Sequence, residues 1–425
     1  MSSIGWIDFS SEHRAKVKSA LDLLKEKGTL DELGIGQIRD GFTEQLFPGI
    51  STIQTRAKYF LIVPRIIRDF QKLDAKSRRK ANGLREFLSY KENIVAVQLD
   101  KHAKQSNVKV TGIIGQTKIG KGGVSRLPSE IYWNGIRTLG LVNTSLSLAD
   151  FCRFQDQHSA RYVESEEDIE SINQEQSNQI VLIPKYDEKW LTDENFNIEL
   201  TFTEAQLIRD RFLESSAIQH SVPSQLFKHQ LANKMFIEEN QYTGDENESE
   251  QVLGFDGLVE RLLTFNQIDT QCQTNLRLAL QFSRAIEGPH IRYNIVLARI
   301  NGFENSEKKY QSEFEAWLEK VNNDNILPEG CEQEWFDVAF RSGFAIRETT
   351  QVFITKFFES VRGGESTAVL DHLVTLQAKR NKQLSSLLNK PNLKDTWYGM
   401  RRLNYRWGTA KIILQDILRG LHAKT

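Results

Sequence analysis

The 425-residue sequence has little of what breaks helices, cross-links chains or crosses membranes. It contains only eight prolines, and Leu, Ile, Lys, Glu, Gln and Arg are common, which favours helices. The three cysteines, Cys152, Cys272 and Cys331, are far apart and form no CxxC pair, so we predict no disulfide framework and a reducing cytosol. The longest apolar run, YFLIVP, is far too short for a membrane span, and the N-terminus lacks the pattern of a signal peptide. We therefore expect a mainly α-helical, multi-helical protein in the cytoplasm, without a membrane partner.

No complete catalytic or metal-binding motif is visible in the sequence. It has no HExxH, no GxSxG and no His/Cys cluster with zinc spacing. His102-Ala-Lys104 matches the HxK of a phospholipase-D-type centre, but no Asp follows at the required spacing. Glu307-Lys308-Lys309 supplies the ExK of a restriction-type nuclease, but it lies in a helical, solvated run. We therefore predict no catalytic residues, no metal and no cofactor, and favour a binding subunit over an enzyme.

A segment rich in glycine and lysine, GQTKIGKG from Gly115 to Gly122, satisfies the GxxxxGK spacing of phosphate-binding loops. The residue after the lysine should be a Ser or Thr whose hydroxyl binds Mg²⁺, and here it is Gly122. That departure disfavours nucleotide hydrolysis. Lys118 and Lys121 are better suited to contact the phosphates of a nucleic acid, which needs no strict spacing. The alternative interpretation is a flexible, basic surface loop.

Charge is unevenly distributed around a net value of −1. Residues 1–160 hold 25 Lys and Arg against 16 Asp and Glu, residues 161–260 hold 7 against 22, and residues 261–425 hold 23 against 18. Within the last region, residues 379–425 hold 11 against 2. Two basic regions thus flank an acidic middle, which indicates an anionic partner for one end or both.

The pattern of apolar residues divides the chain into three parts. Residues 1–163 are predicted to form a basic helical domain, in which a glycine-containing loop after short helices suggests a winged-helix layout. Residues 164–251 hold two acidic linkers around one capped helix, TFTEAQLIRDRFLESS. Residues 252–425 form a second helical domain with basic terminal helices, and it ends in a helical hairpin joined near Pro391. In the first domain we expect one long helix over residues 76–105, a helix beginning near Pro128, and a kink or break at Pro64.

The segment STIQTRAKYFLIVPRIIRDFQKL is the first candidate for direct contact with DNA. We predict an amphipathic helix, and a helix that bears Gln54, Arg56 and Lys58 could read base edges in a major groove. The alternative interpretation is a core helix whose polar face is simply solvated.

The C-terminal RRLNYRW segment is the second candidate. Arg401, Arg402 and Arg406 could grip phosphates while Tyr405 or Trp407 stacks on an exposed base. Alternatively, the aromatic side chains are buried in the helix pair and the arginines either snorkel to the surface or pair with the acidic linkers.

Several phrases of the sequence, taken together, resemble a known family. They are GWIDFS…HR, LDELGIGQIRDGF, LFPGISTIQTRAKYFLIVPRI, RLPSEIYWNGIRTLGL, GPHIRYNIVLARI and LNYRWGTAKIILQDILRGL. The sequence resembles the bacterial domain-of-unknown-function family 6361, nearly from end to end. The resemblance implies a full-length, single-gene family whose members accompany anti-phage defence genes, often beside helicases and phospholipase-D-like proteins. It has no assigned catalytic residues, so none is transferred to this sequence.

Our first hypothesis is therefore a non-enzymatic DNA-binding or adaptor subunit of a multi-protein anti-phage defence system. It would dock a helicase or a phospholipase-D-like nuclease as its partner protein. The second hypothesis is a pure protein–protein scaffold. The third is a diverged nucleotide-binding enzyme or nuclease, centred on Lys121 or on residues 307–309. Binding of DNA that weakens steeply with salt would favour the first hypothesis.

Overall fold

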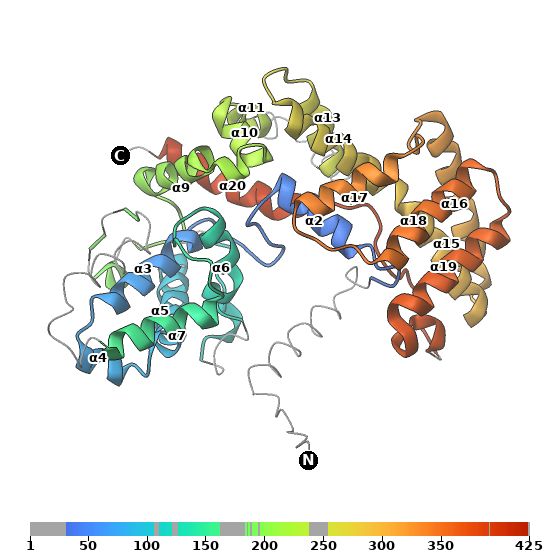
Figure 1. Ribbon diagram of the computed structural model, residues 1–425. Helices are drawn as coiled ribbons and strands as arrows, with labels where there is room; N and C mark the ends of the chain where they lie inside the picture. Colours follow the sequence, from blue (N-terminus) through green and yellow to red (C-terminus); the bar gives the residue numbers. More distant parts are fainter. Residues whose placement is uncertain are drawn as a thin grey trace, which may run out of the picture. The chain divides into compact units, whose positions relative to one another are not determined.

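The computed structural model describes residues 31–105, 110–120, 126–161, 183–237 and 254–423, apart from Lys185, Glu188, Glu194, Asn195 and Pro391. These residues are mainly α-helical, and none of them forms a β-strand (Figure 1). The chain divides into two compact units, which we describe separately. Unit 1 combines residues 1–42 with 274–405, and unit 2 combines residues 43–273 with 406–425. Two of the unit boundaries therefore fall inside helices, namely α2 (Gly36–Leu46) and α14 (Thr270–Ala285).

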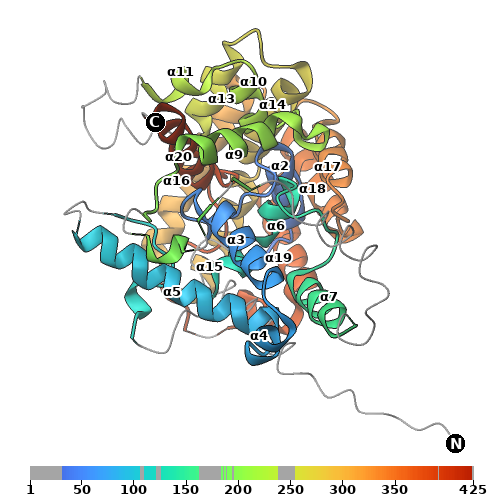
Figure 2. The ribbon, with the colours of Figure 1, turned by 90° about the vertical axis from the view of Figure 1, so that its left-hand side faces the viewer.

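Unit 2 is built around α3, nearly all of which is buried. Tyr59 and Phe60 at its start pack on Tyr132 of α6, with ring centroids 5.4 and 5.0 Å apart. Figure 2 shows the long helix α5 with the short helix α4 at one of its ends. The described helices of this unit are α3 (Tyr59–Gln71), α4 (Ala75–Lys80), α5 (Leu84–Gln105), α6 (Pro128–Thr138), α7 (Leu148–Arg161), α9 (Phe202–Glu214), α10 (Val222–Lys228), α11 (Ala232–Ile237), α13 (Phe255–Leu263) and α20 (Trp407–His422).

Unit 1 is built around α15, which is buried over most of its length and packs on α16 and α19. Trp335 of α17 is fully buried between Phe282 and Phe358, with ring centroids 5.3 and 5.6 Å away. The described helices of this unit are α15 (Glu287–Asn301), α16 (Glu304–Asn323), α17 (Cys331–Arg341), α18 (Glu348–Arg362) and α19 (Thr367–Lys382).

The mainly α-helical class predicted from the sequence is confirmed. Two helix starts are confirmed as well, because each has a local signal. Helix α6 begins at Pro128, where the missing N–H and the fixed φ of proline suit the first turn. Helix α9 is capped by Thr201 and Glu204, which accept each other's backbone N–H at 3.4 and 2.8 Å.

The single helix predicted over residues 76–105 is wrong. The chain forms α4 and α5 instead, and they are separated at Asn82 and Gly83, whose φ angles are +56° and +89°. Positive φ is disfavoured in a right-handed helix, and Asn and Gly are the residues that tolerate it best. Pro64 does not break α3, which is one helix from Tyr59 to Gln71.

Two further expectations about architecture are also wrong for the described residues. The wing of a winged-helix layout needs paired strands, and the described residues contain none. The C-terminal helical hairpin does not form, because α19 packs on α15 and α18 in unit 1 whereas α20 packs on α9 in unit 2. The division at residues 163 and 251 also differs from the two units, since neither unit is continuous in sequence. Residues 1–30 and the acidic stretches 164–180 and 238–251 lie outside the described residues.

Candidate nucleic-acid interface

Gln54, Arg56 and Lys58 precede α3 and are buried in unit 2, with 3, 9 and 5% of their surface exposed. The Gln54 side chain donates a hydrogen bond to the Gly49 carbonyl at 3.0 Å and accepts one from the Ser51 N–H at 3.2 Å. These three residues therefore have no exposed helix face with which to contact a major groove. We leave them out of the candidate interface.

Lys58 belongs to a buried network of charges that joins the start of α3 to α9. Its Nζ and the Arg65 guanidinium each lie 2.7 Å from a different carboxylate oxygen of Glu204. Burial lowers the pKa of Lys58, while the Glu204 carboxylate opposes that shift. For Glu204, burial raises the pKa, but the Lys58 and Arg65 cations outweigh it and the net shift is downward. Lys58 and Arg65 thus link α3 to α9 within unit 2.

The glycine- and lysine-rich loop is only partly described. Gln116 donates to the Asp100 carboxylate of α5 at 2.9 Å, and Asp100 also pairs with Lys104 at 2.7 Å, which attaches the loop to α5. Lys118 is exposed on this loop, as expected for a phosphate contact. Lys121 and Gly122 lie outside the described residues.

The RRLNYRW segment does not present aromatic rings to solvent. Tyr405 and Trp407 are buried, with 2 and 5% of their surface exposed, so neither can stack on a nucleic-acid base. The Tyr405 hydroxyl donates to the Ala279 carbonyl at 2.7 Å, and Trp407 stacks on Phe47 with ring centroids 5.8 Å apart. Of the two interpretations given for this segment, burial of the aromatic side chains is the correct one.

The three arginines of the same segment are paired with acids of the folded helices. Arg401 lies 3.4 Å from Glu313 of α16 and covers the ring of Trp397. Arg402 lies 3.3 Å from Glu287 and Arg406 lies 3.1 Å from Glu44. Arg401 and Arg402 belong to unit 1 and Arg406 belongs to unit 2, so the segment is not one surface.

A basic surface that we did not select from the sequence lies where α3, α4 and α5 meet in unit 2. Lys76, Arg79 and Lys80 stand on one side of α4, at spacings of three and four residues, and all three are exposed. None of the three forms an ion pair with a described residue. We call this surface the basic corner, and its exposed cations are Arg68, Lys72, Lys76, Arg79, Lys80 and Arg85.

Two acids beside the basic corner, Asp69 and Asp74, accept hydrogen bonds from the fold. Asp74 caps α4 by accepting the Ser77 N–H at 2.7 Å, and this hydrogen bond lowers the pKa of the Asp74 carboxyl. Asp69 accepts from the Tyr186 hydroxyl at 3.0 Å and from the Trp190 indole N–H at 2.9 Å. The six exposed cations of the corner nevertheless outnumber the three acids of residues 68–86, which are Asp69, Asp74 and Glu86.

Contacts on both sides of the basic corner also fix its backbone. Arg78 points back from α4, donates to the Gln71 carbonyl and lies over the Phe70 ring at 5.5 Å. Asp156 of α7 caps α5 by accepting the Leu84 N–H at 2.8 Å. A Cβ at Gly83 would meet the Asp156 carboxylate at 2.6 Å, so only glycine leaves room for this cap. The cations are thus displayed from a fixed backbone, which limits the entropy lost on binding.

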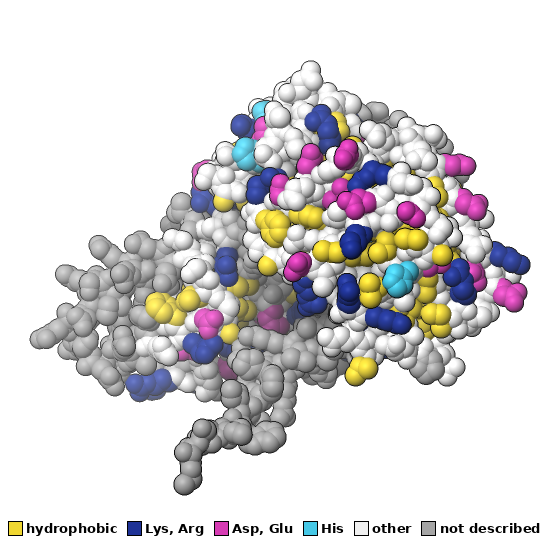
Figure 3. Space-filling model, turned by 45° about the vertical axis from the view of Figure 1, so that its right-hand side comes forward, with side chains coloured by type: hydrophobic (Ala, Val, Ile, Leu, Met, Phe, Trp, Pro, Cys, Tyr) yellow, Lys and Arg dark blue, Asp and Glu magenta, His cyan; other side chains and the backbone are white. Residues whose placement is uncertain are grey.

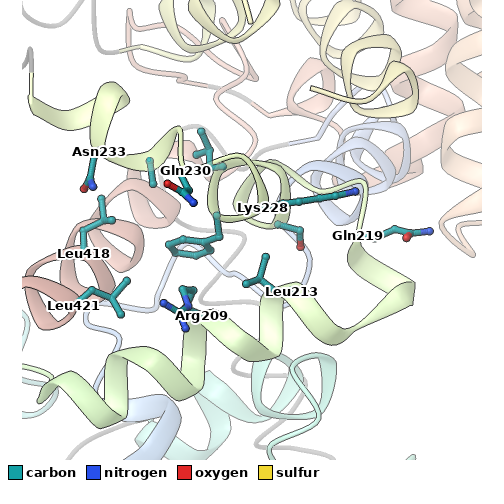
Figure 4. Close-up of a pocket in the computed structure, with 12 residues that line it drawn as sticks. Arg209, Leu213, Gln219, Lys228, Gln230, Asn233, Leu418 and Leu421 are labelled. Carbon is teal, nitrogen blue, oxygen red and sulfur yellow. The ribbon is translucent and has the colours of Figure 1, made fainter. Parts of the chain in front are cut away.

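Unit 2 also contains an open pocket of about 620 Å³ between α9, α10, α11 and α20 (Figure 4). Leu213 of α9 and Leu418 and Leu421 of α20 line its apolar side. The Arg209 guanidinium at its edge pairs with Asp210 at 2.6 Å, and the Ser224 hydroxyl donates to the Phe212 carbonyl at 2.7 Å. Polar side chains such as Gln230 and Asn233 also line the pocket, and its serine has no base within hydrogen-bond distance in the described residues.

The remaining candidates for catalysis are the ExK run, the cysteine thiols and any cluster of metal ligands. Glu307 of the ExK run pairs with Arg299 at 2.8 Å. Burial raises the thiol pKa of each cysteine to about 12, which disfavours the nucleophilic thiolate. The described residues contain no group of three His, Cys, Asp or Glu side chains that could hold a metal ion. Among the described helices, none is both long and apolar enough to cross a membrane.

The fold and the basic corner thus define a multi-helical protein with a candidate polyanion-binding surface. A family model described as a family of unknown function (DUF6361) matches residues 1–239, and the chain belongs to this family. The match covers all of the basic corner, and it ends before the GPHIRYNIVLARI and LNYRWGTAKIILQDILRGL phrases. No curated protein and no solved structure matches the chain.

Proposed function

We propose that the protein is a non-enzymatic subunit that binds DNA through the basic corner of unit 2. The observation that carries the proposal is the display of Lys76, Arg79 and Lys80 on one side of α4. They have no ion-pair partner among the described residues, and the neighbouring Asp69 and Asp74 are engaged in hydrogen bonds of the fold. When cations without an ion-pair partner bind a phosphate backbone, they displace the counterions that surround it, which favours binding.

The composition of the corner supports contact with phosphates rather than with bases. Helix α4 has the sequence AKSRRK, and its lysines and arginines can bind phosphate oxygens whatever the base sequence. It is also only six residues long, so it is too short to follow a groove. Binding through this surface should therefore depend weakly on sequence and strongly on salt.

The test is the affinity for a 20-base-pair duplex, measured by fluorescence anisotropy over a series of salt concentrations. The variant carries Lys76→Glu, Arg79→Glu and Lys80→Glu. Its matched control carries Lys308→Glu, Lys309→Glu and Lys320→Glu, three exposed lysines of α16 that are interspersed with acids and receive the same change in charge. We expect the corner variant to bind at least about tenfold more weakly and to lose about three units of the salt slope.

The control variant should bind as the wild-type protein does. Equal affinity for wild type, corner variant and control would overturn the proposal, and so would wild-type binding that does not depend on salt. Circular dichroism of each variant shows whether the helices are intact.

The wider setting rests on the family resemblance. We propose, as the sequence suggests, that the subunit acts in an anti-phage system and docks a helicase or nuclease partner. Loss of phage protection in the corner variant, with protection retained in the α16 control, would support this setting. Loss of protection in a Lys121→Ala variant that still binds DNA would favour the nucleotide-binding alternative instead.

A further inference from the structure

Helix α19 of unit 1 has apolar residues on two sides, only one of which is covered. Its inner side places Leu370, Val374 and Ala378 in the core of the unit. Its outer side carries Val369 and Leu376, which are seven residues apart and both reach the surface. Val369 is 37% exposed.

Helix α18 lies antiparallel to α19 and packs beside it. Gln377 donates to the Thr350 hydroxyl and Arg347 donates to the Asn381 side chain, both at 3.3 Å, which pairs the start of α18 with the end of α19. Val352, on the outer side of α18, is 39% exposed. We call this surface the α18–α19 face, and its apolar members are Val352, Val369, Leu373, Leu376 and Leu384.

Leu384 is held out from the face by an unusual backbone conformation. Gln383, which ends α19, has φ +50° and ψ −127°, a region that residues other than glycine rarely adopt. The turn that follows α19 is fixed by Glu32, whose carboxylate accepts the Leu387 N–H at 3.1 Å and the Ser386 hydroxyl at 3.2 Å. The result is a leucine with 93% of its surface exposed at the end of the apolar strip. Backbone strain of this kind is typical of functional positions.

Exposed charges of both signs lie on α18, on α19 and between them: Glu348, Glu359 and Glu365 are exposed, and the cations gather near the end of α19. Asp371 is the acid of α19, and it is held by Arg292 and Arg299 at 2.9 and 3.0 Å. By contrast, the basic side chains near the end of α19 form no ion pair with a described residue. They are Arg347, Lys379, Arg380 and Lys382. Figure 3, in which the right-hand side of Figure 1 comes forward, shows bands of hydrophobic side chains with Lys, Arg, Asp and Glu side chains beside them.

We propose that the α18–α19 face docks an acidic amphipathic helix of a partner protein. An apolar strip about two helical turns long, followed by unpaired cations, complements a helix with apolar residues every three to four positions and Asp or Glu on its flanks. A nucleic acid would satisfy the cations but leave the leucines in water. The proposal concerns unit 1 alone and does not depend on the basic corner of unit 2.

The test uses the full-length protein and a labelled 21-residue peptide with Leu at helical spacing and Glu elsewhere. A scrambled peptide of the same composition and a peptide with Lys in place of Glu serve as probes of specificity. One variant carries Lys379→Glu and Arg380→Glu, and a second carries Leu376→Ser and Leu384→Ser. Ile300→Ser, at an exposed apolar position of α15 outside the face, is the matched control.

We expect the acidic peptide to bind the wild-type protein and the Ile300→Ser control equally, and both face variants at least about tenfold more weakly. The scrambled and lysine peptides should not bind.

Three results would overturn the proposal. The first is equal binding of the acidic peptide to all variants. The second is a wild-type dimer in sedimentation that Leu384→Ser disrupts, which would assign the face to a second copy of the chain. The third is loss of duplex DNA binding in the charge variant but not in the leucine variant.

Discussion

Arg56 and Asp416 form a buried ion pair in unit 2, with the guanidinium Nε 2.8 Å from the carboxylate Oδ2. Asp416 also accepts the backbone N–H of Ala57 at 2.9 Å, and Arg56 donates to the Thr111 carbonyl at 3.2 Å. The pair therefore ties α20, the last helix of the chain, to the segment that precedes α3. The contact therefore joins the two chain segments that make up unit 2, residues 43–273 and 406–425.

Removing one partner of this pair should destabilise the protein strongly. In an Asp416→Ala variant the Arg56 cation stays buried without its counterion, and the Ala57 N–H loses its acceptor. We expect the free energy of unfolding to fall by about 3–5 kcal/mol, measured by urea denaturation. The control is Arg419→Ala, whose side chain is 68% exposed and 3.8 Å from Asp416, and it should cost no more than about 0.5 kcal/mol. Similar losses in both variants would contradict the buried pair.

The Tyr132 hydroxyl makes three hydrogen bonds that position the same segment. It accepts the N–H groups of Thr55 and Arg56 at 2.7 and 3.0 Å and donates to the Arg56 carbonyl at 2.9 Å. Tyr132→Phe leaves these backbone groups without a partner, so we expect a loss of about 2–4 kcal/mol in thermal or urea unfolding. Tyr90→Phe, at a tyrosine that is 64% exposed, should change stability by less than about 0.5 kcal/mol. DNA affinity should not change in either variant, because neither hydroxyl belongs to the basic corner.

Local signals in the sequence account for the elements that were predicted correctly. Pro128 and the pair Thr201 and Glu204 mark helix starts through their own backbone chemistry, so no distant residue is needed. The Asn82-Gly83 break is an equally local signal, because both residue types tolerate the positive φ angles that end α4 before α5. The KSRRK run of α4 was likewise visible, and only the structure shows that three of its cations face outward.

Burial of polar residues could not be predicted in the same way. The sequence pattern places Lys58 on a solvated or DNA-reading face, but its acceptor Glu204 lies 146 positions further along the chain. The arginines of RRLNYRW fall into two units for a similar reason, since the boundary lies between Tyr405 and Arg406. Periodicity identifies a helix and its apolar side, whereas the partner of each buried charge depends on tertiary contacts.

Gly135 of α6 marks the closest approach between that helix and the rest of unit 2. A Cβ at this position would lie 2.4 Å from the Gly49 carbonyl oxygen and 2.6 Å from the buried ring of Phe60. Gly135→Ala should therefore destabilise the protein by about 1–3 kcal/mol, even though alanine favours helices by about 1 kcal/mol. The control is Gly408→Ala in α20, where no neighbouring atom lies within 4 Å, and it should be neutral or slightly stabilising in thermal unfolding. A stabilised Gly135→Ala variant would show that α6 can move away from Gly49.

Glu92 of α5 should make the protein less stable as the pH rises. Its carboxyl group is 1% exposed and accepts the Ser129 N–H and hydroxyl at 2.6 and 3.1 Å. Burial raises the pKa of Glu92 from 4.5 to about 8, against the opposing effect of these hydrogen bonds. Between these two values the folded protein keeps a proton that the unfolded chain releases, so this group's stabilising contribution is present below pH 4.5 and is lost as the pH rises toward 8.

The variant that isolates this effect is Glu92→Gln, which is neutral at every pH and keeps an acceptor for the Ser129 N–H. Urea unfolding of wild type and variant should give similar stabilities near pH 4.5. At pH 8 the variant should be more stable than the wild type by about 4 kcal/mol, since each unit of pKa shift corresponds to about 1.4 kcal/mol. The comparison cancels the other titrating groups, because they are the same in both proteins. A difference between the two proteins that stays constant from pH 4.5 to 8 would mean that Glu92 is already ionised in the folded state.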